Sequence, residues 1–248
     1  MCNLYAMLAG QDSTRRHFAV DPARDYLGNA EPLPAIWPKY EAPILRLGED
    51  GTRELISAHW GFLTPKVSAK TGKSLKPDAW NNARDDKLTK SGLWKDSFLN
   101  RRCLIPGTSF REAKGRNPAK DFWFALVGTD PRPIFAFAGL WRSGQPGIEG
   151  DEGDWTTHTM VTTSPNEQVE PVHPTRMPVI LDPQDYEAWL HGSPAEAAEL
   201  LRPFPAHKMR IAKQGISILS DTRNADSLRT ESQNTSYSAL GPSAPDSP

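Results

Sequence analysis

The sequence lacks any apolar run long enough to cross a bilayer. Its longest apolar stretches, residues 122–128 and 135–141, fall far short of the roughly 20 residues that a membrane helix needs. The opening residues MCNLYAMLAG carry no positive charge before a short apolar stretch, which is not typical of a signal peptide. Two cysteines, far apart in the chain, exclude a disulfide framework. We therefore expect a soluble, cytoplasmic protein of a reducing compartment, with no membrane partner.

The sequence also lacks most of the motifs that indicate a cofactor or a metal site. The six histidines form no HxH or HExxH pair, and there is no CxxC, GxGxxG or GxSxG sequence. TGKS at residues 71–74 resembles the end of a phosphate-binding loop, but Val67 stands where its first glycine is required. We expect no cofactor and no metal ion.

The composition is that of a globular protein with an unusual amount of proline. Apolar residues make up 38% of the 248 and charged residues 24%, while proline occurs 23 times. Frequent proline breaks long helices and favours short strands and turns. The patterning predicts a single α+β domain over residues 1–224, rich in antiparallel strands with helices outside, and a disordered tail over residues 225–248.

Local patterns place the elements of this domain. Residues 42–60 predict a hairpin, and GTDPR at residues 128–132 predicts a second one between two apolar strands. Residues 91–100 have near-helical spacing, Asp182 and Pro183 predict the start of a helix that reaches Gly192, and Ser193 with Glu196 predicts a capping box. The expected strands are 43–47, 53–60, 101–106, 122–127, 133–141, 157–163 and 178–181.

Charge is distributed unevenly although the total is close to neutral. The chain carries a net charge of −1, with 29 Lys and Arg against 30 Asp and Glu. Basic residues concentrate between residues 60 and 120, and the rest of the chain is acidic. Such a segment can attract phosphates. The alternative is a solvated lysine-rich loop, which is how residues 65–78 look.

Cys2 is the most informative residue. Removal of Met1, expected before a small second residue, would leave an α-amine and a thiol on adjacent carbons. The α-amine has a reference pKa near 7.7 to 8.0, and the thiol is a strong nucleophile. An aldehyde can form an imine with this amine, which the thiol then closes into a thiazolidine. The alternative is an incidental terminal cysteine. Cys103 is expected to be a buried core thiol.

A series of short motifs resembles the SOS response-associated peptidase (SRAP) family, the abasic-site shielding proteins. Each motif is weak alone, but they follow the family order across roughly residues 1–190. The motifs are Met1-Cys2, HWGFLTP (59–65), NNAR (81–84), RRCLIPGTSFREA (101–113), PIFAFAGLW (133–141), TMVTTSPNE (159–167) and PVHPTRMPVIL (171–181). The resemblance implies a barrel-like sheet and a covalent link between the N-terminal cysteine and the ring-opened abasic sugar of single-stranded DNA. It also implies self-removal of Met1 and makes lyase-type strand cleavage conceivable.

The resemblance assigns a role to each of four residues. It implies that Cys2 is the nucleophile, that Asn82 positions the sugar, that Glu112 handles protons beside the amine, and that His173 assists ring opening. These residue types suit those tasks. Each also has a structural alternative. Asn82 can make a turn or cap a helix, Glu112 can pair with a neighbouring surface cation, and His173 can be a half-buried histidine.

DNA contacts are expected along the basic segment. Arg84 lies two residues beyond Asn82 and can bind a phosphate in a bidentate manner. Trp60 can stack on a base beside the lesion, or it can be a core aromatic at a strand end. The remaining candidates for the basic track are Arg101, Arg102, Lys114 and Arg116.

Three motifs depart from the usual family pattern. The family commonly begins MCGR, whereas Asn3 and Leu4 follow Cys2 here. The usual FYEW-like element is FREA at residues 110–113, and the usual HxRMP element is one residue longer at residues 173–178. We interpret the chain as a divergent branch, and we expect a monomer whose partner is single-stranded DNA containing abasic sites.

Two other functions are compatible with the sequence. An N-terminal-nucleophile amidohydrolase would also use Cys2, with its α-amine as the base, but would not need the basic segment. A binding module without catalysis would bind DNA or protein reversibly and would not need Cys2.

Overall fold

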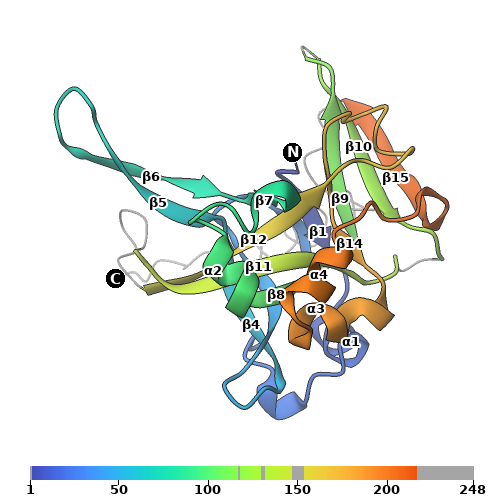
Figure 1. The fold of residues 1–248 in the computed structure, drawn as a ribbon. Coiled ribbons are helices and arrows are strands. Elements are labelled where there is room, and N and C mark those ends of the chain that lie inside the picture. Colours follow the sequence, from blue (N-terminus) through green and yellow to red (C-terminus); the bar gives the residue numbers. More distant parts are fainter. Residues whose placement is uncertain (1, 117, 130–131, 147–153, 217–248) are drawn as a thin grey trace, which may run out of the picture.

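A closed ring of five strands forms the centre of the molecule in the computed structural model, which describes residues 2–116, 118–129, 132–146 and 154–216 (Figure 1). The ring closes because β12 pairs with both β4 and β11, in the order β12-β4-β3-β8-β11. Neighbours are antiparallel except for the parallel pair of β12 and β4. The five strands are β3 (Glu41–Leu47), β4 (Arg53–Trp60), β8 (Arg102–Gly107), β11 (Phe135–Pro146) and β12 (Asp154–Thr163). Three short strands extend this barrel: β7 (Asn82–Arg84), β13 (Met177–Pro178) and β14 (Ile180–Leu181).

A second sheet of five antiparallel strands packs beside the barrel. Its order is β15-β10-β9-β1-β2, so the N-terminal strand lies between β9 and β2. The strands are β1 (Tyr5–Met7), β2 (Leu33–Ile36), β9 (Ser109–Lys114), β10 (Lys120–Leu126) and β15 (Met209–Ile216). The position of β1 within this sheet places Cys2 against β9 rather than on a loose end.

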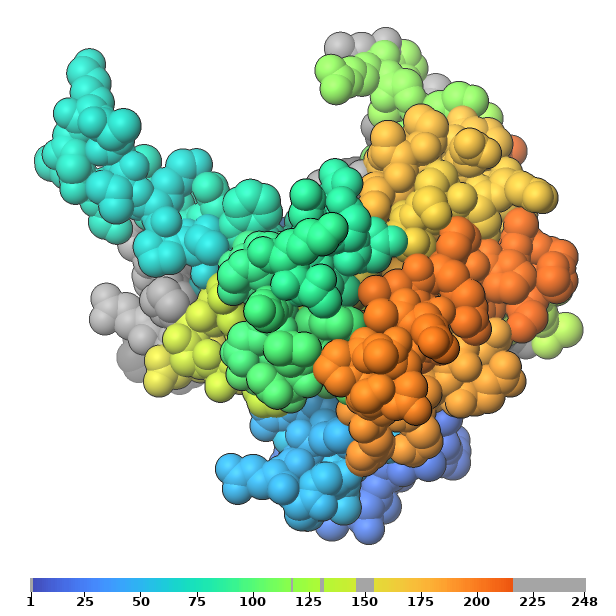
Figure 2. Space-filling view, in the orientation of Figure 1, coloured from blue at the N-terminus to red at the C-terminus, as the bar shows by residue number. Residues whose placement is uncertain are grey.

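A two-stranded hairpin projects from the body of the molecule (Figures 1 and 2). It consists of β5 (Phe62–Val67) and β6 (Ser74–Trp80), and we call it the β5–β6 arm. Gly61 joins β4 to β5 with a φ of +126°, a conformation in which a side chain would be strained. The expectation of a lysine-rich loop over residues 65–78 was therefore wrong, because backbone pairing between β5 and β6 orders most of this segment.

The helices are short and lie outside the sheets. They are α1 (Gln11–His17), α2 (Lys95–Asn100), α3 (Tyr186–His191) and α4 (Pro194–Glu199), with 3-10 turns η1 (Pro22–Arg24), η2 (Asp85–Lys87), η3 (Pro183–Asp185) and η4 (Ala206–Lys208). Trp189 of α3 fastens the helical side to the barrel by donating its indole N–H to the carbonyl of Cys103 at 2.9 Å. Within the described residues no helix has both the length and the apolar character to span a membrane.

Two large apolar clusters stabilise the fold. One lies between the barrel and the five-stranded sheet and contains Cys2, Tyr5, Trp60 and Phe110. The other lies under the helices and includes Trp189. Cys103 is fully buried in the first cluster, as expected of a core thiol. The candidate nucleophile therefore sits at the edge of the main core, where packing determines its position.

Most predicted elements are confirmed, and two are corrected in addition to the expected loop over residues 65–78. The hairpin at residues 42–60 and the capping box of Ser193 and Glu196 are present. GTDPR is not a hairpin, because the strand before it belongs to the five-stranded sheet and the strand after it belongs to the barrel. Asp182 makes no capping hydrogen bond, since its carboxylate binds Lys208 Nζ at 3.0 Å instead. The predicted tail over residues 225–248 lies outside the described residues, and the sequence did not predict α1.

Candidate functional site

Pairing between β1 and β9 positions Cys2. Tyr5 is opposite Phe110, and the amide of Arg111 donates to the carbonyl of Leu4 at 2.9 Å. Glu112 lies two residues beyond Phe110 on β9, and its charge acts on the Cys2 thiol, so the two side chains lie close together. The Cys2 side chain is 1% exposed, and its thiol donates to the carbonyl of Leu4 at 3.4 Å. The thiol is therefore held in one place by the sheet.

Two adjacent asparagines hold the backbone of Cys2 from the barrel side. The carbonyl of Cys2 accepts hydrogen bonds from Asn82 Nδ2 at 2.6 Å and from Asn81 Nδ2 at 3.0 Å. Asn82 begins β7, which pairs in parallel with β12 opposite Met160. Asn82 thus contacts Cys2 directly, and the turn or helix-cap alternative does not describe its contacts.

The side-chain oxygen of Asn82 is available as a hydrogen-bond acceptor among the described residues. Asn82 is 9% exposed, and its Oδ1 is buried without a hydrogen-bond partner among the residues that the structure describes. A buried acceptor that lacks a donor costs free energy, so such atoms are uncommon in folded proteins. Because Nδ2 is already bound to Cys2, Oδ1 can accept a hydrogen bond from a hydroxyl or amine brought next to Cys2.

Glu112 supplies a carboxyl group with unusual proton affinity. It lies on β9 and is 4% exposed, so its carboxyl group is removed from the surface. Burial raises the pKa of the Glu112 carboxyl to about 7, although the charge of Arg111 lowers it. Arg111 itself binds the fully buried carboxylate of Asp121. Glu112 can accordingly take up or release a proton near neutral pH.

Glu112 and the surrounding core act together on the Cys2 thiol. Burial raises the pKa of this thiol well above its usual range, and the nearby charge of Glu112 raises it further. The thiol is therefore protonated at neutral pH. In this environment the thiol is a weaker first nucleophile than an exposed thiolate would be.

His173 lies in the loop that joins β12 to β13. Its Nδ1 is 2.9 Å from the carbonyl of Arg176 and 3.3 Å from the amide nitrogen of the same residue, so the Arg176 backbone holds the ring. Burial lowers the pKa of this half-buried imidazole. The ring is thus biased toward its neutral form.

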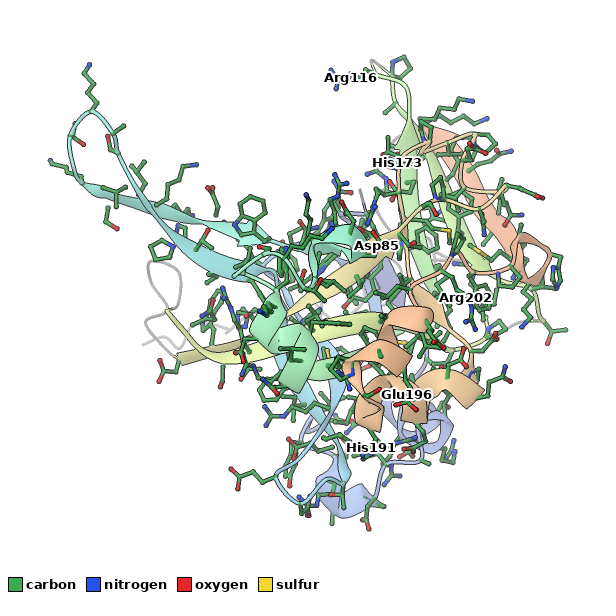
Figure 3. All side chains as sticks on the ribbon, in the orientation of Figure 1. Asp85, Arg116, His173, His191, Glu196 and Arg202 are labelled. Atoms are coloured by element: carbon green, nitrogen blue, oxygen red, sulfur yellow. The ribbon has the colours of Figure 1, made fainter. Side chains whose placement is uncertain are left out.

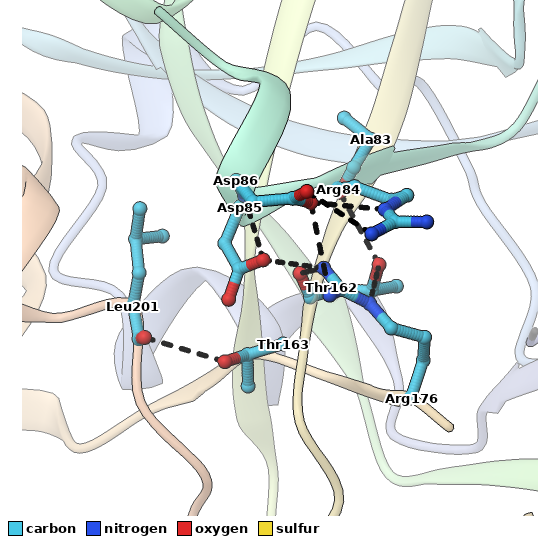
Figure 4. A network of polar contacts seen from close by, with 8 residues as sticks. All are labelled: Ala83, Arg84, Asp85, Asp86, Thr162, Thr163, Arg176 and Leu201. Atoms are coloured by element: carbon cyan, nitrogen blue, oxygen red, sulfur yellow. Dashed lines mark hydrogen bonds and ion pairs between the residues drawn. The ribbon is translucent and has the colours of Figure 1, made fainter.

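Arg176 ties the His173 loop to the strand that carries Asn82 (Figure 4). Its guanidinium binds Asp85 Oδ1 at 2.6 Å, Thr162 Oγ1 at 3.3 Å and the carbonyl of Thr162. Asp85 begins η2 directly after β7, so one side chain connects η2 and β12 to the His173 loop. Asn82 binds Cys2 directly, and Glu112 is close enough for its charge to act on the Cys2 thiol. His173 is linked to the Asn82 side of the site through the contacts of Arg176.

Two residues expected to bind DNA have structural roles instead. Trp60 is fully buried, packs edge-on against Tyr5 at 4.9 Å and donates its indole N–H to the carbonyl of Asn81 at 2.8 Å. Arg102 is 8% exposed and donates to the carbonyls of Phe98 and Trp189. Neither group presents a surface to a base or a phosphate, so both expectations are corrected: a fully satisfied buried group serves packing rather than recognition.

The other expected DNA contacts are at least partly accessible. Arg101 lies after α2, is half-buried and binds Asp96 and the carbonyl of Trp141. Arg84 is exposed but is held by a bidentate ion pair with Asp86 at 2.9 and 3.0 Å. The remaining two candidates, Lys114 and Arg116, are exposed at the end of β9 and in the turn before β10.

Sequence reasoning missed two residues that organise the site. Asn81 was quoted only as part of the NNAR motif, and Arg176 only as part of HPTRMP. The doubled asparagine was the available signal for Asn81, and an arginine close to His173 was the signal for Arg176. Within the described ranges, no cluster of three or more His, Cys, Asp or Glu side chains could hold a metal ion.

Comparisons with known proteins agree on one family. A family model described as SOS response associated peptidase (SRAP) matches residues 1–215. The chain is 28% identical over 229 residues to "Abasic site processing protein YoqW" of Bacillus subtilis (strain 168), covering 90% of this chain and 96% of that protein. It is 27% identical over 247 residues to "Abasic site processing protein YoaM" of the same organism, covering 94% and 99%.

Solved structures share the fold. A protein from Bordetella bronchiseptica superposes with a TM-score of 0.64 at 22% identity, covering 87% of this chain and 99% of that one. A protein from Bacteroides thetaiotaomicron superposes with a TM-score of 0.64 at 20% identity, covering 87% and 91%. The expected α+β fold with a barrel-like sheet and outer helices is confirmed.

Proposed function

Because the chain belongs to the SOS response-associated peptidase family, we propose that it processes abasic sites in DNA by forming a covalent crosslink through Cys2. The observation that carries this proposal is the convergence of Cys2, Asn82 and Glu112, with a buried Asn82 oxygen that has no donor among the described residues. The curated relatives, named as abasic site processing proteins, support the substrate class.

The proposed reaction begins with hydrolysis of the Met1–Cys2 peptide bond by the protein itself, in which one water is consumed, methionine leaves and the α-amine of Cys2 is exposed. An abasic sugar in its open form carries an aldehyde. The amine attacks the aldehyde carbon, forming a C–N bond, and loss of water gives an imine. The sulfur then attacks the imine carbon to form a C–S bond, and the thiol proton passes to the nitrogen. The product is a thiazolidine, and water is the by-product.

Each polar group near Cys2 has a place in this reaction. Glu112, with its carboxyl pKa raised to about 7, takes the proton that the ammonium form of the amine must lose. Asn82 Oδ1 accepts a hydrogen bond from a hydroxyl of the open sugar. His173, which is biased toward the neutral form, moves a proton during ring opening. If the imine persists, elimination at the adjacent carbon would cleave the strand, and this is the proposed lyase activity.

A denaturing gel with an oligonucleotide containing one abasic site tests the proposal. The wild-type chain should give a band of reduced mobility that survives denaturation, and Cys2→Ser should not. Cys103→Ser is the matched control, because Cys103 is the other cysteine and is buried in the same core. The oligonucleotide control carries a tetrahydrofuran, which has no aldehyde.

Three outcomes would contradict the proposal. A shifted band that persists in Cys2→Ser would exclude Cys2 as the attacking residue. An intact mass that retains Met1 in a crosslinking-competent preparation would exclude the aminothiol. Hydrolysis of small amides without any crosslink would favour the amidohydrolase alternative.

A further inference from the structure

The β5–β6 arm has exposed apolar surface that the rest of the described chain does not cover. Val67 is 60% exposed, Leu75 44% and Trp80 48%. A two-stranded hairpin is only marginally stable in water by itself. The arm keeps its backbone pairing while three large apolar side chains are exposed. This combination is typical of a segment that binds a partner rather than of one that packs into the core.

The arm is also strongly basic. It carries Lys66, Lys70, Lys73 and Lys76 but a single acidic residue, Asp78. Among the described ion pairs, Asp78 is bound by Lys66 at 3.0 Å, and the other three lysines are exposed. The arm therefore presents uncompensated positive charge to solvent, which favours a polyanionic partner.

Trp80 connects this basic arm to the candidate site. Its indole N–H donates to Thr64 Oγ1 at 2.9 Å, which holds the exposed ring against β5. The next two residues are Asn81 and Asn82, whose side-chain amides hold the carbonyl of Cys2. An aromatic ring held in place this close to the site in sequence is suited to stack on an unpaired base. Proteins commonly bind single-stranded nucleic acids with aromatic side chains that stack on bases and basic side chains that contact the phosphates.

The arm forms one wall of a hollow in the molecular surface (Figure 2). The hairpin of β9 and β10 rises on the other side, with Arg116 at its tip and His173 below it (Figure 3). β9 carries Glu112, and β6 leads directly into Asn81 and Asn82, which bind the carbonyl of Cys2, so both walls begin beside Cys2. A strand attached at Cys2 would leave the site between them.

We propose that the β5–β6 arm binds the single strand on one side of the abasic site, with a base stacked on Trp80 and the backbone phosphates against Lys70, Lys73 and Lys76. This inference rests on the proposed function, because it takes the abasic strand as the occupant. The arm thus adds a noncovalent contact to the covalent one and fixes which flank of the lesion must be unpaired.

Fluorescence anisotropy of the full chain with a labelled tetrahydrofuran oligonucleotide tests the proposal without crosslinking. Trp80→Ala should weaken binding by about 5-fold or more, while Trp80→Phe should retain most of the affinity. The arm triple variant, in which Lys70, Lys73 and Lys76 are changed to Gln, should lower the slope of log Kd against log salt by about 2. In the matched control, three exposed residues away from the arm, Arg16, Lys95 and Arg202, are changed to Gln. This control variant should keep most of the wild-type salt slope.

Trimmed oligonucleotides identify the flank. On an oligonucleotide shortened on the side that the arm binds, wild type and Trp80→Ala should bind equally. On one shortened on the other side, the difference should persist. The proposal would be overturned if Trp80→Ala lost the same affinity on both shortened oligonucleotides. It would also be overturned if Trp80→Ala and the arm triple variant kept the wild-type affinity and salt slope, and the arm would then be a candidate for binding a protein.

Two controls separate this result from other failures. Thermal unfolding shows whether each variant is folded, and the lysine substitutions, which alter exposed side chains, test the arm independently of Trp80. Crosslinking of a true abasic oligonucleotide with excess protein should still reach completion in the arm variants. Failure of wild type to crosslink would refute the proposed function, whereas anisotropy would still report on the arm.

Discussion

The proton chemistry of Glu112 gives a pH dependence that can be calculated from its environment. Burial raises the pKa of this carboxyl to about 7, so about one tenth is ionised at pH 6 and about nine tenths at pH 8. If the carboxylate accepts the proton of the Cys2 amine, its contribution to the crosslinking rate should grow about 10-fold between these pH values. Glu112→Gln keeps the shape of the side chain but cannot accept the proton.

The ratio of wild-type to Glu112→Gln rates isolates this contribution. The Cys2 amine also titrates, near its reference pKa of about 7.7 to 8.0, but it does so in both proteins and largely cancels in the ratio. The assay is single-turnover crosslinking of an abasic oligonucleotide at pH 6, 7 and 8, with excess protein. We expect the ratio to rise about 10-fold from pH 6 to pH 8. A ratio that is constant with pH would refute a proton-accepting role for Glu112.

The same raised pKa makes a prediction for stability. The folded protein holds the Glu112 proton more tightly than the unfolded chain, whose carboxyl has a pKa of 4.5. Stability from this group is therefore fully present below pH 4.5 and is lost as the pH rises to about 7. Glu112→Gln removes that loss, which is on the order of 3 kcal/mol from the size of the shift. Denaturant unfolding should show Glu112→Gln gaining stability relative to wild type between pH 4.5 and 7.

Three further substitutions separate the structural from the chemical residues. Arg102→Met should lower the free energy of unfolding by about 1–3 kcal/mol, because buried carbonyls lose their donors, yet anisotropy should show DNA affinity within about 2-fold of wild type. Asn82→Ala should slow crosslinking about 2- to 10-fold, since the carbonyl of Cys2 loses a donor and the sugar an acceptor; unchanged single-turnover rates would contradict this. Arg176→Ala should slow crosslinking by releasing the His173 loop, and Arg176→Lys should restore part of the rate; equal rates in both variants and wild type would exclude that positioning role.

Local pattern predicted the strands better than their partners. The apolar alternation and turn residues between residues 42 and 60 are sufficient to predict a hairpin, because both strands and their turn are adjacent in the chain. No local feature indicates that β12 pairs in parallel with β4 and thereby closes the barrel. The error at GTDPR has the same origin, since a turn sequence does not reveal that the strands on either side enter different sheets.

The sequence predicted the reactive residues of the candidate site but not the residues that hold them in place. Cys2 stood out because an N-terminal aminothiol has its own reactivity, whatever the fold. Asn81 and Arg176 act by holding a backbone carbonyl and a loop, and those roles depend on neighbours that only the tertiary structure brings close. Two tryptophans show the same limit: Trp60 precedes the arm and is buried in the core, whereas Trp80 ends the arm and is exposed.

The environment of Cys2 also bears on the order of the two bond-forming steps. Burial and the charge of Glu112 keep the thiol protonated, so the sulfur is a poor first nucleophile. The amine that Met1 removal would expose has a reference pKa near neutrality and lies beside a carboxyl whose pKa is about 7. The aldehyde should therefore meet nitrogen first and sulfur second. Borohydride, which reduces an imine but not a thiazolidine, should trap wild type only at early times. Cys2→Ala, which retains the amine but has no sulfur, should remain trappable throughout, and a wild-type chain that is never trapped would place sulfur first.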